Sequence, residues 1–142
     1  MNNVTNSKTY KPSDTRALKE LRGFCEDGAC LCDTAADVAA QRRYVRFFGE
    51  LRRRYASAAS AFEQMLEGPR PRHNRYRPAV TDRDRPELPR IGIFADMQAL
   101  TWRRTEVFYR VLNTNLSSQI RKLIVDQARL LCEPYQWSDQ PE

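Results

Sequence analysis

The sequence lacks any long apolar run and contains little glycine. No stretch approaches the roughly 18 apolar residues of a transmembrane helix, so we expect no membrane span. Only five glycines occur in 142 residues. β-Branched residues are sparse, whereas alanine, leucine, arginine, glutamine and glutamate are abundant, and these residues favour helices. The composition therefore predicts an all-α fold with a core of ordinary size.

Histidine is nearly absent, and recognisable catalytic motifs are missing as well. His73 is the only histidine, and it lies among arginines and prolines. There is no phosphate-binding glycine loop, no nucleophile elbow and no carboxylate pair at a useful spacing. We therefore expect a protein that is not an enzyme and that needs no cofactor. The polar segment 1–11 has no apolar core of a secretory signal, which predicts an intracellular protein of the cytosol or an organelle.

Lysine is scarce, whereas arginine is abundant. Only four of the 24 basic residues are lysine, and the formal net charge is +6. Arginine carries a planar fork of donors that suits carboxylates and phosphates. The charge predicts either a solvated basic face or an anionic partner, and that partner is an acidic protein surface or nucleic acid.

Apolar periodicity divides the chain into an arm at 1–12 and one helical domain at 13–142. A short helix is expected at about 15–25, started by Ser13 or Asp14 and ended by a turn at Asp27-Gly28. A long helix is expected at about 34–67, capped by Asp33 or Thr34. Its apolar stripe steps by four and three residues through Tyr44, Phe48, Leu51, Tyr55, Ala58, Phe62 and Met65.

A third helical segment is expected at about 96–132, followed by a tail at 133–142. Apolar residues recur from Met97 to Leu131, but Asn113-Thr114-Asn115 interrupts them, so one kinked helix and two helices both fit. The run Ile91–Phe94 is interpreted as an extended piece before a cap at Asp96. We expect the helices at 34–67 and 96–132 to form a long antiparallel hairpin.

The segment 68–90, called here the Pro/Arg-rich connection, differs in composition from the rest. It holds five prolines and seven arginines against three acidic residues, so it is predicted to be extended. Basic residues alternate with an aromatic, which suits either an acidic protein surface or single-stranded nucleic acid. We predict partner contacts here and at the tail aromatics, through Arg70, Arg72, Arg75, Tyr76, Arg77, Tyr135 and Trp137.

Four cysteines lie near predicted helix ends. In the expected hairpin Cys25, Cys30, Cys32 and Cys132 converge. Buried free thiols are the main interpretation, while a structural zinc ion or one or two disulfides are the alternatives. The Cys-x4-Cys-x-Cys spacing differs from the Cys-x2-Cys pairs of common zinc sites.

Short segments resemble the core proteins of hepatitis B-like viruses. Leu112–Asn115 with Ile120, Arg121 and Leu123 is similar to the spike helix of that family, and Pro12–Asp14 and Phe48–Leu51 are similar to other segments in the same order. The resemblance implies a helical-hairpin dimer that builds a capsid. The stretch between the long helices is much longer here than in mammalian virus cores, and no further helix is expected after Cys132.

Three functional hypotheses follow from these residues. The first is a non-enzymatic accessory or scaffolding subunit of a larger assembly, bound through helical packing and the Pro/Arg-rich connection. The second is a basic nucleic-acid-binding or nucleocapsid-type protein, whose affinity would fall steeply with salt. The third is a small inhibitor that docks on an enzyme. A further copy of the chain is another candidate partner.

Overall fold

A computed structural model describes residues 10–67 and 90–137, and this part of the chain is helical without any strand. The predicted all-α class is confirmed. The helices are α1 (Pro12–Val38), α2 (Arg42–Glu67), α3 (Arg90–Leu112) and α4 (Ser118–Leu131).

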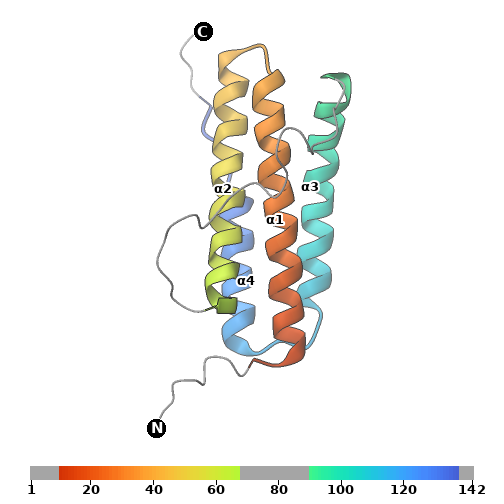
Figure 1. Ribbon diagram of the computed structural model, residues 1–142, viewed down its shortest axis with the longest axis vertical. Coiled ribbons are helices and arrows are strands. Elements are labelled where there is room, and N and C mark those ends of the chain that lie inside the picture. The colour runs from red at the N-terminus through yellow and green to blue at the C-terminus, as the bar shows by residue number, and fades with distance from the viewer. Residues whose placement is uncertain (1–9, 68–89, 138–142) are drawn as a thin grey trace.

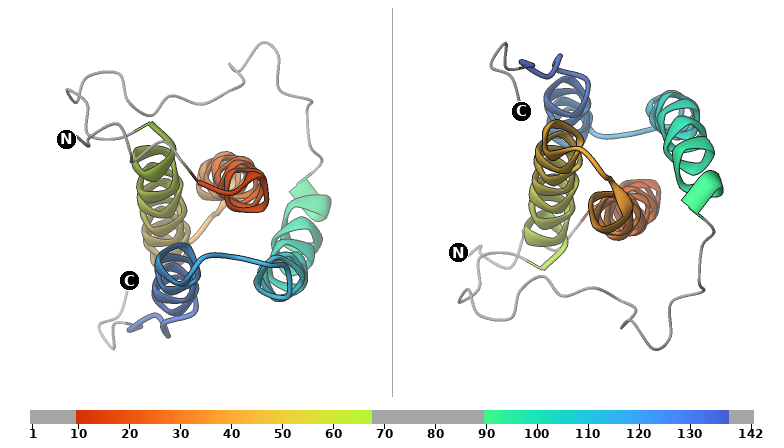
Figure 2. Two further views of the ribbon diagram at one scale, coloured as in Figure 1. Left: turned by 90° about the horizontal axis from the view of Figure 1, so that it is seen from below. Right: turned by 90° about the horizontal axis from the view of Figure 1, so that it is seen from above.

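The four helices form a bundle in which the chain runs up, down, down and up (Figure 1). Residues 39–41 join α1 to α2 as an antiparallel pair, and residues 113–117 join α3 to α4. Because α2 ends and α3 begins at opposite ends of the bundle, these two helices run in the same direction. The two end-on views in Figure 2 place α1 between α2 and α3, with α4 beside α2.

The core is built around α1, which packs heavily against α2 and also against α3. Direct contacts between α2 and α3 are few. The predicted stripe of α2 is largely buried, and so is the apolar series that begins at Met97. Aromatic rings connect the helices edge to face, as in the pair of Phe24 with Tyr55 and the pair of Phe24 with Phe108. The largest completely buried side chains are Tyr55, Phe62, Leu18, Leu21, Ile93, Ile120 and Ile124.

The first helix is much longer than predicted. It continues through Gly28, where a turn was expected, and ends at Val38, so Asp33 and Thr34 lie inside α1 and do not cap α2. Glycine occurs at position 28 because the ring of Tyr55 on α2 occupies the space of a side chain there. Lys11 is the N-cap, without a side-chain capping bond, so Ser13 and Asp14 do not start the helix.

The predicted hairpin also has the wrong arms. The heavily packed antiparallel pair is α1 with α2, whereas the third segment is two helices separated by residues 113–117. The helix α3 therefore ends before Asn113-Thr114-Asn115, and of the two alternatives, one kinked helix or two helices, the second is correct. The run Ile91–Phe94 belongs to the first turns of α3, which begins at Arg90 and not at Asp96.

Several predictions fall on parts of the chain outside residues 10–67 and 90–137. These parts are most of the arm 1–12, nearly all of the Pro/Arg-rich connection and the last five residues of the tail. The division into an arm and one domain at 13–142 remains a prediction.

Candidate functional site

Helix α3 presents aromatic side chains on the face that points away from the core. Trp102 is 75% exposed and Tyr109 is 72% exposed. Each follows a buried core residue by two positions, Leu100 and Val107, which is about 200° around the helix. Helix α3 therefore carries two large aromatic side chains on the side opposite to its buried face. We call Trp102 and Tyr109 the outer aromatic face.

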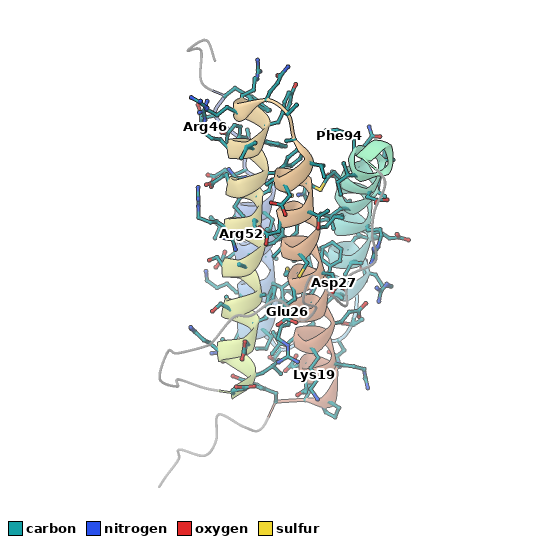
Figure 3. All side chains as sticks on the ribbon, turned by 45° about the horizontal axis from the view of Figure 1, so that its top comes forward. Lys19, Glu26, Asp27, Arg46, Arg52 and Phe94 are labelled. Carbon is teal, nitrogen blue, oxygen red and sulfur yellow. The ribbon has the colours of Figure 1, made fainter. Side chains whose placement is uncertain are left out.

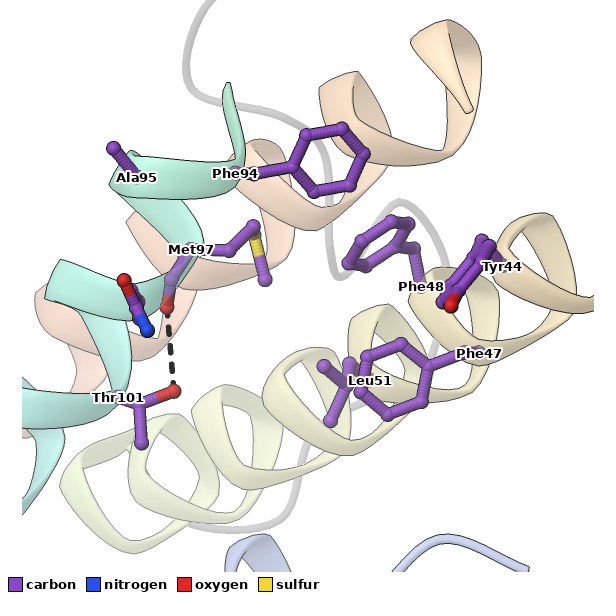
Figure 4. A pocket seen from close by; sticks show the side chains of 9 residues that line it. Tyr44, Phe47, Phe48, Leu51, Phe94, Ala95, Met97 and Thr101 are labelled. Atoms are coloured by element: carbon purple, nitrogen blue, oxygen red, sulfur yellow. Dashed lines mark hydrogen bonds between the residues drawn. The ribbon is translucent and has the colours of Figure 1, made fainter. Parts of the chain in front are cut away.

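A groove lies between α2 and α3 near the ends where both helices begin (Figure 4). Its volume is about 510 Å³. The rings of Phe48 and Phe94 approach across it with their centroids 6.0 Å apart. Most of the surface is apolar, and the lining residues are Tyr44, Phe47, Phe48, Leu51, Phe94, Ala95, Met97, Gln98 and Thr101.

The predicted tail residues Tyr135 and Trp137 pack against α2 of the same chain. Trp137 stacks on Phe47 with a centroid distance of 4.9 Å, and Tyr135 meets the same ring edge to face. The guanidinium of Arg43 lies 4.9 Å from the Trp137 ring centroid. Trp137 remains 41% exposed, so its outer part is accessible. The tail thus extends the aromatic wall of the groove along α2.

Arginines on the polar face of α2 have partners within the protein. Glu50 pairs with Arg54 one helical turn later, and Arg53 contacts the same carboxylate. These two arginines lower the pKa of Glu50 through side-chain hydrogen bonds. Arg52 pairs with Asp33 across the α1–α2 interface, and Figure 3 shows it on the flank of α2. Such pairing reduces the positive charge available for phosphates.

Arg104 brings a guanidinium into the interior of the bundle. Its Nη1 donates to the Tyr55 hydroxyl at 3.2 Å and lies 3.5 Å from the carbonyl of Leu131. Its Nε is buried and finds no hydrogen-bond partner among the described residues. Burial raises the pKa of Tyr55 to about 12, against the opposing influence of Arg104. This polar layer links α2, α3 and the end of α4.

The four cysteines are free thiols with different environments. Cys25 and Cys32 are buried in α1, Cys30 is half-buried and Cys132 is exposed at the end of α4. Burial raises the pKa of Cys25 and of Cys32 to about 12, which keeps these thiols protonated and unreactive. No disulfide joins any of the four. In residues 10–67 and 90–137 no group of histidine, cysteine and acidic side chains has the geometry of a metal site.

The predicted contacts of Arg70, Arg72, Arg75, Tyr76 and Arg77 fall outside the described residues. None of the helices described is long and apolar enough to cross a membrane. Comparison of the chain with protein-family models, with curated proteins and with solved structures found no match. The short resemblance to viral core proteins is therefore not supported by a family match.

Sequence reasoning missed the outer aromatic face and the groove. Trp102 and Tyr109 lie close in sequence to the buried core residues Leu100, Val107 and Phe108, so an apolar pattern alone does not separate them from the core. Each of the two aromatics follows a core position by two residues. Such an offset places it on the opposite side of the helix, where it cannot be buried in the same core. The groove had no comparable signal, because it depends on which helices fail to meet.

Proposed function

We propose that this protein is a non-enzymatic accessory or scaffolding subunit that binds a larger protein assembly through the outer aromatic face of α3. The observation that carries the proposal is the exposure of Trp102 and Tyr109, at 75% and 72%, on a helix whose opposite side already fills the core. Tryptophan and tyrosine dominate the energetic centres of protein interfaces. A protein partner would bury the apolar surface of this face, which is otherwise exposed to water.

Charge supports a protein partner over nucleic acid as the first choice. Arg110 is tied to Glu20 by two contacts on the surface, and Arg52, Arg53 and Arg54 also have acidic partners. Phosphate tracking requires a continuous row of available cations. The Pro/Arg-rich connection stays part of the proposal as a second contact, made with an acidic surface of the same assembly.

Affinity capture with quantitative mass spectrometry tests the proposal directly. The double variant Trp102→Ala, Tyr109→Ala should retain its protein partners at least about ten-fold less well than the unaltered protein, because two anchoring side chains are lost. Leu130→Ala is the matched control, since Leu130 is 53% exposed but lies on α4. Thermal melting of all three proteins verifies that the bundle is intact.

Equal recovery of the same partners by the double variant would refute this role for α3. Recovery of RNA or DNA instead, with an affinity that falls steeply between low and physiological salt, would favour the nucleic-acid hypothesis. Recovery of a single enzyme in stoichiometric amount, with loss of its activity, would identify the inhibitor hypothesis as correct.

A further inference from the structure

The groove between α2 and α3 exists because the fourth helix is too short to fill it. Helix α4 has 14 residues, about 21 Å, whereas α2 has 26 residues, about 39 Å. Past Leu131 the chain turns onto α2, where the backbone carbonyl of Glu133 accepts a hydrogen bond from Arg54 and Trp137 stacks on Phe47. Among the residues that the structure describes, this part of α3 packs mainly on α1, and it meets α2 in the ring pair of Phe48 and Phe94. The missing length corresponds to about three helical turns.

The walls of the groove are apolar at the positions that a fourth helix would contact. Close to α1, Phe48 is 4% exposed and Met97 is 8% exposed, and these side chains form the floor. Phe94 is 52% exposed and stands at the rim on α3 (Figure 4). Gln98 and Thr101 are exposed on the same wall. A helix with apolar residues at i, i+3 or i+4, and i+7 presents a matching stripe.

The electrostatics of the groove favour an acidic occupant. Helices α2 and α3 both begin at this end of the bundle (Figure 2), so the positive ends of two helix dipoles lie together. Neither helix carries an acidic residue in its first turn. Arg42 and Arg43 begin α2, and the guanidinium of Arg43 lies over the rim residue Tyr44. The opposing negative charges are Asp37, Asp96 and the C-terminal end of α1, and neither of the two acids lines the groove.

We infer that this groove binds an amphipathic helix of about three turns from an acidic partner protein, which completes the bundle as its missing fourth-helix segment. The apolar side chains of that helix lie on Phe48, Leu51 and Met97, and its carboxylates face the first turns of α2 and α3. The inference rests on the proposed function and adds the class of partner segment. Helix-in-groove recognition of this kind needs only three or four anchoring side chains.

A displayed library of random 15-residue peptides tests the inference without knowledge of the native partner. Selection on the full chain should enrich peptides with helical apolar spacing and a net negative charge. A fluorescently labelled peptide from the enriched pool should gain helicity on binding and should lose affinity by about ten-fold or more with Gln98→Glu, because that change places a like charge inside the groove. Gln98→Lys should keep or tighten binding.

Gln64→Glu provides the matched control. Gln64 is an exposed glutamine of α2 that does not line the groove, so this variant should bind the peptide within about two-fold of the unaltered protein. Enrichment of basic or non-helical peptides would overturn the inference. So would a failure to enrich any peptide above a support without protein, or equal affinities for the Gln98 and Gln64 variants.

Failure of the groove is distinguishable from failure of the proposed function. Trp102 and Tyr109 do not line the groove. If the native partners depend on the outer aromatic face but not on Gln98, only the inference about the groove is refuted. If the selected peptide binds as expected but substitution of Trp102 and Tyr109 does not change recovery of the native partners, the proposed docking face is wrong. The inference about the groove then still holds.

Discussion

At Gly28 the backbone of α1 lies against a ring of α2, and a Cβ built there would come within 2.9 Å of Cδ1 of Tyr55. Tyr55 is 1% exposed and its hydroxyl accepts from Arg104, so the ring has little room to move. We expect Gly28→Ala to lower the free energy of unfolding by about 1–3 kcal/mol, although alanine favours a helix. Chemical denaturation measures the change.

Gly23 is the matched control, because a Cβ at that position meets nothing within 4 Å. Gly23→Ala should raise the free energy of unfolding by about 0.5–1 kcal/mol, which is the ordinary gain of alanine over glycine inside a helix. Changes of the same sign at both positions would show that helix propensity, and not the contact with Tyr55, governs Gly28.

The same residue explains the largest error in the prediction from sequence. Asp27-Gly28 resembles a turn when only local preferences are considered, because glycine is a poor helix former. The apolar spacing nevertheless continues through Cys25, Ala29, Cys32 and Ala35, all of which are buried. This continuity was available in the sequence. The reason for the glycine was not, because it depends on how closely two helices approach.

Helix α4 is held at its first residues by the start of α1. The carboxylate of Asp14 is 1% exposed and accepts from the backbone N–H and the hydroxyl of Ser117, both at 2.9 Å. Ser117 is the N-cap of α4. We expect Asp14→Ala to destabilise the protein by about 1–3 kcal/mol, because a part-buried N–H loses its acceptor. Thermal or chemical denaturation reveals the loss.

Asp37→Ala serves as the control for this prediction. Asp37 is exposed near the C-terminal end of α1, where an acidic residue is unfavourable for the helix dipole. Its removal should leave stability unchanged or slightly higher. A loss for Asp37→Ala as large as that for Asp14→Ala would contradict the role of Asp14 as an anchor.

At the scale of elements, the sequence predicted correctly which face of each helix is buried, but it did not predict which helices pack together. The stripes of α2 and of the segment after Met97 were correct because burial follows helical periodicity. The choice of hairpin arms was wrong, since a stripe does not say which helix covers it. That choice depends on whether the chain turns sharply or crosses the bundle, and the two alternatives bury the same residues.

For the whole molecule, the buried thiols and Tyr55 predict a loss of stability in alkali. Burial raises the pKa of Cys25 and Cys32 from 9.0 to about 12, and that of Tyr55 from 10.0 to about 12. The unfolded chain therefore releases these protons first. Below pH 9 their contribution to stability is complete, and it is lost as the pH rises from about 9 to 12.

The infrared S–H stretching band, which disappears when a thiol ionises, checks this prediction. In a Cys30→Ser, Cys132→Ser background the two remaining thiols of the folded protein should ionise well above pH 9, whereas the same thiols in urea should ionise near their ordinary value. Ionisation near pH 9 in the folded state would show that Cys25 and Cys32 are accessible. Iodoacetamide modification, followed by mass, gives an independent readout.

The candidate site was predictable only in its general character. Partner binding through aromatic and basic residues stays a prediction, and the rings of Tyr135 and Trp137 pack on Phe47, which lines the groove. The outer aromatic face could have been found from the position of Trp102 relative to Leu100. The groove required the length of α4 relative to its neighbours and the path of the chain after Leu131, which periodicity does not encode.

The contact between Asp14 and Ser117 has a consequence for biosynthesis, because its residues are 103 positions apart. A ribosome releases α1 and α2 long before it releases α4. Because α1 and α2 are adjacent in the sequence, they can pack against each other early in synthesis. The apolar surface of the nascent hairpin that α4 later covers stays open to solvent until α4 itself has been translated. Chaperones that bind apolar surface on nascent chains therefore have the most time to bind this intermediate.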